Sequence, residues 1–214
     1  MPPEGGQAFR SSGGVGMSLN FHWLTAIDGE FPAPGRTQAS FDAAEHLLVH
    51  DPAFSASSTR SSLWDGLERY LTRFFDLEAR HADLLEGRDL VRCLWLGGSF
   101  VSGRVDPANI DATVCIDDRA RLALKGKPGS KWLSQAFSRD ERKKEFGVSP
   151  LELRYRPVVS VFRSRVRDTD DQRYLQDRGG WDEWWQRRRD PGATTGAPSL
   201  ATVEAKRGYL EVTL

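Results

Sequence analysis

Residues 94–118 decide the fold, and they read LWLGGSFVSGRVDPANIDATVCIDD. Two apolar runs, residues 90–96 and 110–116, have the length and the composition of strands. The loop between them contains glycines and Pro107, which are residues typical of turns. The stretch therefore predicts two strands joined by a turn-rich loop.

The loop between the two strands carries groups that suit an anion. Gly97 and Gly98 have no Cβ atom, so their backbone N–H groups can approach an anion closely, and the Ser99 hydroxyl adds a further donor. Asp111 enters the second strand and would present a carboxylate to the cation that accompanies the anion. The residues thus predict a site for an anion and a divalent cation.

Two well-known motifs fail here on residue identity. A P-loop requires G-x-x-x-x-G-K-[ST]. Gly98 and Gly103 have that separation, but Arg104 and Val105 replace the lysine and the hydroxyl residue. A serine nucleophile elbow requires G-x-S-x-G, and Val101 stands where its last glycine must be. Neither a P-loop nor a serine hydrolase is therefore expected.

The same stretch resembles the signature of the polymerase-beta-like nucleotidyltransferase superfamily, in which Gly-Ser ends an apolar strand and an aspartate enters the next strand. The matching residues are 94–99 and 110–111. The run from Gly98 to Asp111 is also similar to that of a group of small, uncharacterised bacterial members, and so are residues 31–35, 184–190 and 206–212. The resemblance covers most of the chain from about residue 17 onward.

The resemblance implies an α/β (α+β) fold of nucleotidyltransferase type, a small mixed sheet with packed helices. It also implies transfer of a nucleotidyl group from a nucleoside triphosphate to a protein, RNA or small acceptor, with Mg²⁺ as cofactor. In this hypothesis Ser99 and Asp111 are catalytic, and Asp111 also binds the metal. The residues expected to bind the nucleotide are Gly97, Gly98, Ser99, Ser102, Arg163 and Arg165.

Two departures from the superfamily pattern lead to an alternative. This chain has Thr113 where the pattern has a second acid, and Ser149 where we expect the third. One carboxylate cannot hold two divalent cations about 4 Å apart. The alternative is a catalytically degenerate member that binds a nucleotide or a partner protein, because bacterial members of this size are often toxin–antitoxin components. Four other acids would restore a metal site if one of them faced the loop: Asp106, Asp117, Asp118 and Glu152.

The composition limits the other classes of function. The chain is long enough for one domain, expected over residues 18–214, after a tail of residues 1–17 that is predicted to be disordered, with Met17 as an alternative start. The net charge of zero does not indicate nucleic-acid binding, and no apolar run predicts a membrane span, which favours a cytoplasmic protein. Cys93 and Cys115 are expected to be buried and reduced, although their strands could bring them into contact.

Apolar periodicity predicts one long helix before the first strand. Between residues 59 and 76, and on toward 85, apolar side chains recur every three or four residues, so one buried stripe is expected. A shorter helix is expected from Ser40, its predicted N-cap, to about residue 50. The arginines expected at the solvent edge of the long helix are Arg60, Arg69 and Arg73.

Alternating apolar and polar residues predict strands after position 150. Residues 151–156 are expected to form a half-buried strand and residues 158–166 a second one. Arg163, Arg165 and Arg167 would share one face of the second strand. Such a stripe suits a triphosphate or a nucleic-acid backbone, and equally a solvent-facing edge strand.

The C-terminal part is expected to contain a helix and a closing pair of strands. The helix opens at Trp181, and its tryptophans are expected to pack it on the domain, with stacking on nucleobases as the alternative. Residues 190–199 predict a flexible loop. Residues 200–204 and 209–214 are expected to form the last two strands.

Overall fold

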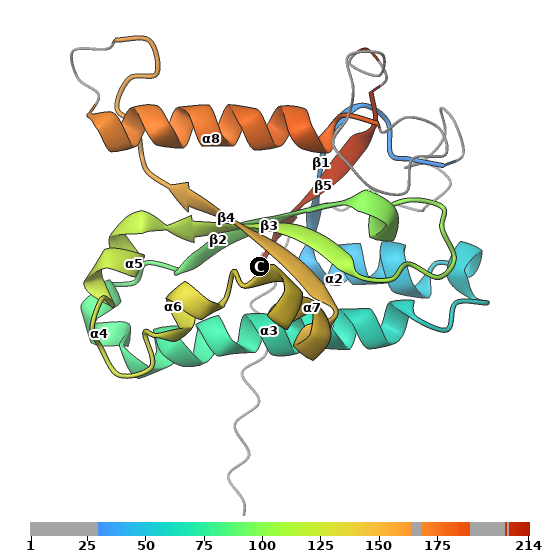
Figure 1. Ribbon diagram of the computed structural model, residues 1–214, viewed down its shortest axis with the longest axis horizontal. Helices are drawn as coiled ribbons and strands as arrows, with labels where there is room; N and C mark the ends of the chain where they lie inside the picture. Colours follow the sequence, from blue (N-terminus) through green and yellow to red (C-terminus); the bar gives the residue numbers. More distant parts are fainter. Residues whose placement is uncertain (1–29, 164–167, 189–203, 205) are drawn as a thin grey trace, which may run out of the picture.

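A five-stranded sheet forms the centre of the molecule in a computed structural model that describes residues 30–163, 168–188, 204 and 206–214 (Figure 1). The strands are β1 Gly35–Ser40, β2 Val91–Gly97, β3 Ile110–Asp117, β4 Val148–Tyr155 and β5 Gly208–Thr213. Their order is β1-β5-β2-β3-β4. The pairs β1–β5 and β3–β4 are parallel, whereas β2 is antiparallel to both β5 and β3. The expected small mixed α/β sheet is confirmed.

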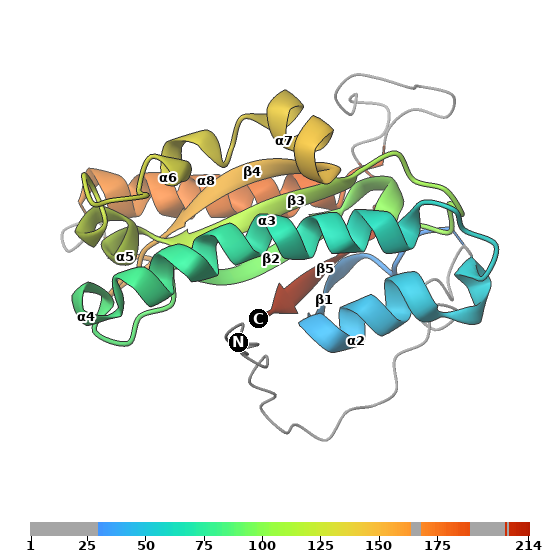
Figure 2. The same ribbon diagram turned by 90° about the horizontal axis from the view of Figure 1, so that it is seen from below.

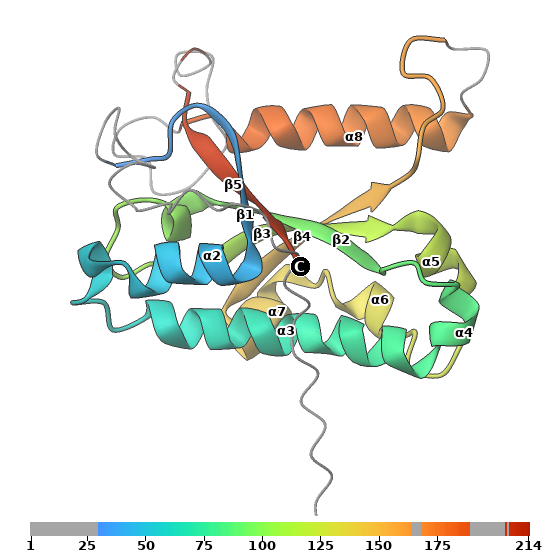
Figure 3. The ribbon, with the colours of Figure 1, turned by 180° about the vertical axis from the view of Figure 1, so that it is seen from behind.

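Helices cover both faces of the sheet. In the described residues the α-helices are α2 Phe41–Glu45, α3 Arg60–Arg80, α4 Ala82–Leu85, α5 Asp118–Ala123, α6 Trp132–Gln135, α7 Arg139–Phe146 and α8 Thr169–Trp185. The short helices of other types are η1 His46–His50, η2 Pro52–Phe54 and η3 Gly98–Val101. Helices α2, α3, α6 and α7 lie on one side of the sheet and α8 lies on the other, as Figures 2 and 3 also show. Within the described part, no helix has the length and apolar character to cross a membrane.

Helix α3 confirms the predicted apolar stripe. Its buried apolar side chains recur at helical spacing and join the main core between α3 and the sheet. They are Leu63, Trp64, Leu67, Tyr70, Leu71, Phe74 and Leu77. The expected N-cap at Ser40 is also confirmed, because the Ser40 hydroxyl accepts a hydrogen bond from the Ala43 N–H at 3.2 Å.

Helix α8 begins much earlier than predicted. It starts at Thr169 rather than at Trp181, and the Asp168 side chain caps it by accepting from the Asp171 N–H at 2.7 Å. Its buried side chains, Tyr174 and Trp185, pack on the opposite face of the sheet from α3. The tryptophans therefore do pack this helix on the domain. This second core contains Trp95, Cys115, Leu153, Tyr174, Trp185 and Tyr209.

The strand predicted over residues 158–166 is wrong in its described part. Strand β4 begins at Val148 and ends at Tyr155, and residues 156–163 form an irregular segment. Pro157 lacks a backbone donor to continue the pairing, and Val159 and Phe162 are exposed. Arg165 and Arg167 lie outside the described residues, as do the tail of residues 1–17, the loop of residues 190–199 and residues 200–203 of the expected strand.

Candidate functional site

The Gly-Ser loop, which we define as residues 97–102, lies against Asp111 at one end of the sheet. Gly97 and Asp111 are opposite each other on β2 and β3. The chain turns at Gly98, whose φ of +69° suits glycine, and a Cβ atom there would lie 2.6 Å from Asp111 Oδ2. Glycine at position 98 therefore lets the carboxylate lie beside the loop. Ser99 follows and is partly exposed.

Asp111, Thr113 and Ser149 share one face of the sheet. Asp111 and Ser149 are partners in the parallel pair β3–β4. Thr113 is two residues further along β3, so its side chain points to the same face, which is the face that α8 covers (Figure 1). The structure thus brings together the aspartate and the two hydroxyl residues at which the sequence departs from the three-acid pattern.

Thr113 is hydrogen-bonded to helix α8. Trp185 Nε1 donates to Thr113 Oγ1 at 2.9 Å, and both residues are buried. The Trp185 ring also lies on Gly97, where a Cβ atom would be 2.2 Å from the ring. The position of the expected second acid is therefore occupied by a hydroxyl that holds α8 against the sheet.

Ser149 is hydrogen-bonded to an arginine at the start of α7. Arg139 donates from Nε and from Nη2 to Ser149 Oγ at 3.0 and 2.8 Å. The same Nη2 atom lies 3.8 Å from Asp111 Oδ1. The Arg139 side chain is 56% exposed and that of Asp111 is 29% exposed, so solvent reaches both charges. A positive charge therefore lies beside Asp111, where the pattern predicts a third negative one.

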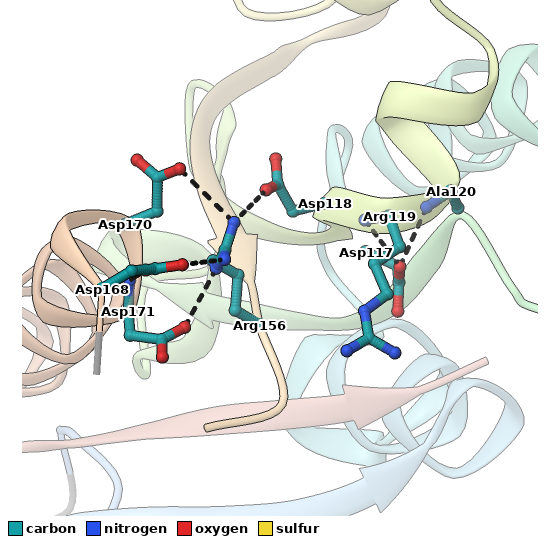
Figure 4. A network of polar contacts seen from close by, with 8 residues as sticks. All are labelled: Asp117, Asp118, Arg119, Ala120, Arg156, Asp168, Asp170 and Asp171. Atoms are coloured by element: carbon teal, nitrogen blue, oxygen red, sulfur yellow. Dashed lines mark hydrogen bonds and ion pairs between the residues drawn. The ribbon is translucent and has the colours of Figure 1, made fainter. Parts of the chain in front are cut away.

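Two of the other acids accept hydrogen bonds near the start of a helix, and one of them, Asp117, caps that helix. Asp106 Oδ1 accepts from the Ser58 N–H at 2.8 Å and from the Ser57 and Ser58 hydroxyls just before α3. The hydrogen bond from the Ser58 N–H is the main cause that lowers the pKa of Asp106. Asp117 caps α5, because its Oδ1 atom accepts from the backbone N–H groups of Arg119 and Ala120 at 3.0 Å each (Figure 4). Neither carboxylate takes the place of the second acid.

The remaining two acids are in ion pairs away from the loop. Asp118 Oδ2 lies 3.1 Å from Arg156 Nη1, within the network drawn in Figure 4. Glu152 pairs with Arg121 at 3.2 Å and with Arg154 at 3.0 Å. Each carboxylate is thus neutralised by an arginine beside it. Neither restores the metal site.

The residues at the loop do not fit a two-metal centre. Among the described residues that the sequence singled out, Asp111 alone places a carboxylate against the Gly-Ser loop, and Arg139 lies close to it. Two divalent cations require several anionic oxygens and are repelled by a guanidinium. In the described part of the chain, no three His, Cys, Asp or Glu side chains gather in a way that suits a metal ion.

Arg60 holds the loop in place, contrary to the expectation that it is solvated. It is 1% exposed, and all five of its N–H donors reach backbone carbonyls. The carbonyls belong to Leu48 at 2.8 Å, Phe100 at 2.7 Å, Ser102 at 2.9 Å, Arg104 at 2.7 Å and Val105 at 3.3 Å. Burial lowers the pKa of Arg60 to about 10, partly offset by Asp106. The sequence around Arg60 does not indicate that this arginine is buried or that it binds the loop.

Other predicted binding residues have different positions. Ser102 is buried, and its hydroxyl donates to the Ser99 carbonyl at 2.8 Å, so it stabilises the turn of the loop. Arg163 is exposed and lies in the segment that follows β4. Ser149 is at the start of β4, whereas this segment begins at the other end of the strand. The structure does not bring Arg163 to the loop. Arg165 lies outside the described residues.

The described residues define a mixed α/β protein in which one end of a helix-covered sheet carries a glycine-rich loop, one carboxylate and one exposed guanidinium. The chain belongs to a family of unknown function (DUF6932), whose sequence model matches residues 27–213. No curated protein and no solved structure matches the chain.

Proposed function

We propose that this is a cytoplasmic, nucleotidyltransferase-like protein that has lost two-metal catalysis and binds a nucleoside triphosphate at the Gly-Ser loop. One observation carries the proposal. The two positions that lack an acid, Thr113 and Ser149, are hydrogen-bonded to Trp185 and Arg139, so neither is open to a metal ion. The resemblance of the loop to the superfamily supplies the class of ligand.

Arg139 would supply the positive charge that a metal ion supplies in an active nucleotidyltransferase. A guanidinium binds phosphate oxygens through charge-assisted hydrogen bonds, and the glycine-rich loop can add backbone N–H donors. Lys143 lies one turn after Arg139 on α7. Lys143 and Lys144 line a shallow hollow together with Ala108 and Asp140. Arg139, Lys143 and Lys144 outnumber the one acid in the hollow, Asp140, which favours a polyphosphate over a single phosphate.

Calorimetric titration tests this proposal. ATP, GTP, CTP and UTP are titrated into the full chain, once with Mg²⁺ and once with EDTA. We expect binding that persists in EDTA. Arg139→Ala should weaken binding about tenfold or more, the effect of losing roughly 1.4 kcal/mol. Asp111→Ala should bind as well as the original protein or more tightly, because it removes a negative charge beside the phosphates.

Arg119→Ala is the matched control for Arg139→Ala. Arg119 is exposed on α5, beyond the far end of β3 from Asp111, and its removal should not change the affinity. Binding that requires Mg²⁺ and disappears in Asp111→Ala would contradict the loss of metal chemistry and favour an active transferase. The absence of binding for all four triphosphates in both conditions would end the nucleotide proposal and leave a partner protein as the ligand to seek.

A further inference from the structure

The two cysteines of the chain face each other across neighbouring strands. Cys93 on β2 and Cys115 on β3 are directly opposite in the antiparallel register, and both thiols are free. Cys115 belongs to the second core, under α8, and Cys93 packs against that core. The register of the pairing shifts beside Cys93, between Val91 and Cys93.

We propose that Cys93 and Cys115 are a redox-active pair that a hydroperoxide converts into a reversible cross-strand disulfide. The inference concerns residues outside the proposed nucleotide site and stands without it. Because the Gly-Ser loop and Asp111 lie between the two cysteines along the chain, the disulfide would close a covalent ring that contains both of these parts of the candidate site.

The two thiols differ in the way that a reactive pair requires. Cys93 is partly exposed, whereas Cys115 is only 5% exposed. The hydrogen bond with Cys115 is the main cause that lowers the pKa of Cys93; burial and Glu211 oppose it, and Arg36 and Arg92 add to it. The hydrogen bond with Cys93 and then burial raise the pKa of Cys115. Cys93, the more exposed of the two thiols, is therefore the one that attacks the hydroperoxide, and the buried Cys115 is the thiol that resolves.

The strands need to move only a little to form the bond. Residues directly opposite on antiparallel strands have Cβ atoms about 4.5–5.5 Å apart, and a disulfide holds them at about 3.5–4.5 Å. The register shift beside Cys93 interrupts the regular pairing, so the backbone there can adjust. A disulfide formed with such adjustment is easily reduced again, which is the property of a regulatory rather than a structural bond.

The reaction balances without a metal or a bound cofactor. The Cys93 thiolate attacks one oxygen of the hydroperoxide, the O–O bond breaks, and hydroxide or alkoxide leaves and takes a proton. The sulfur is thereby oxidised to a sulfenic acid. The Cys115 sulfur then attacks the Cys93 sulfur, the S–O bond breaks, the S–S bond forms, and water leaves with the Cys115 proton.

Peptide mapping of the full chain tests the pair directly. The reduced protein is exposed to hydrogen peroxide, denatured, treated with N-ethylmaleimide and digested without reductant. We expect a peptide that joins Cys93 to Cys115, in a monomer that carries no maleimide, and dithiothreitol should restore both adducts. Two remaining adducts, or disulfides only between molecules, would overturn the proposal. This readout uses the natural sequence and does not depend on how a variant folds.

Two variants test which thiol attacks. In Cys115→Ala, peroxide should leave a sulfenic acid at Cys93 that dimedone traps. In Cys93→Ala, Cys115 should react far more slowly, at least tenfold, because it is buried, and burial both hinders the peroxide and raises the pKa of the thiol even without Cys93. Faster trapping at Cys115 than at Cys93 would overturn the assignment of roles. Oxidation of the natural sequence should also raise its midpoint of thermal unfolding, since the ring restricts the unfolded chain.

Discussion

The face of the sheet that carries α3 and the face that carries α8 bury their residues in different ways. The α3 face holds the larger core, in which helices from α2 to α7 contribute apolar and aromatic side chains. The α8 face holds a much smaller core, and α8 is further held by polar contacts near both of its ends. Added NaCl screens ion pairs but does not screen hydrophobic burial. Helix α8 is therefore the element that solution conditions can loosen.

The polar contacts of α8 lie at its two ends. Arg156, after β4, contacts three aspartates at the start of α8 and Asp118 of α5 (Figure 4). At the other end, Trp185 donates to Thr113, and the Tyr209 hydroxyl donates to Asp182. The candidate site lies under the second end. Substitutions on the two faces and at the two ends of α8 therefore test separate parts of this comparison.

The largest loss of stability is expected on the α3 face, from Arg60→Met. The variant removes five hydrogen bonds and leaves buried carbonyls without donors, which should cost about 3–5 kcal/mol of unfolding free energy. Urea denaturation followed by circular dichroism measures it. Arg69→Met, on the exposed side of the same helix, is the control and should change stability by less than about 0.5 kcal/mol. Equal effects of the two substitutions would contradict the role of Arg60.

The next effect is expected where α8 meets the site, from Gly97→Ala. The added Cβ atom would overlap the Trp185 ring, so the indole must shift and lose its hydrogen bond to Thr113, at a cost of about 2–3 kcal/mol. The same substitution in a Trp185→Ala background should cost much less, because the ring is gone. Denaturant unfolding of the natural sequence, the two single variants and the double variant gives the coupling free energy between Gly97 and Trp185. Additive costs would show that Trp185 does not lie on Gly97 in solution.

Some elements of the fold could be predicted from the sequence because they depend on local apolar periodicity. Strands β2 and β3 and helix α3 each have a strong pattern of their own, and the pattern placed them within a few residues. The early start of α8 was missed because residues 169–180 are mostly polar or charged and include Gly179 and Gly180, so they show no apolar stripe.

The sequence predicted which residues lie at the candidate site, but not the hydrogen bonds that they make. The motif located Asp111, Thr113 and Ser149, and the register places them together. Their partners could not be found in the same way, since the Trp185 contact with Thr113 spans 72 residues and depends on how α8 packs. The role of Arg60 was missed for the same reason, because its acceptors are backbone carbonyls that any sequence supplies.

A smaller, salt-dependent effect is expected at the start of α8, from Arg156→Met. The loss of the guanidinium leaves several carboxylates facing one another, which should cost about 1–2 kcal/mol at low ionic strength. The cost should shrink in 1 M NaCl, where the Debye length is about 3 Å. Arg173→Met, which removes an exposed pair with Asp177 within α8, is the control with little expected effect. A cost that does not change with salt would show that Arg156 acts by packing alone.

The smallest effect, and the one of opposite sign, is expected in the middle of α8 from Gly179→Ala. Both Gly179 and the following Gly180 lie inside the helix and are exposed, and a Cβ atom at either would meet no neighbour. Alanine should therefore raise the unfolding free energy by about 0.5–1 kcal/mol, because glycine loses more backbone freedom in a helix.

Thermal unfolding of Gly179→Ala, Gly180→Ala and the double variant measures this gain, which should be roughly additive. The result also bears on how the two ends of α8 are connected. A gain in unfolding free energy would mean that the helix runs unbroken from the Arg156 network to Trp185. The two ends of α8 would then move as one rigid element, so that loosening one end would also displace the other. A loss of stability would mean that the helix bends at the glycines in solution, so that each end docks on the sheet independently.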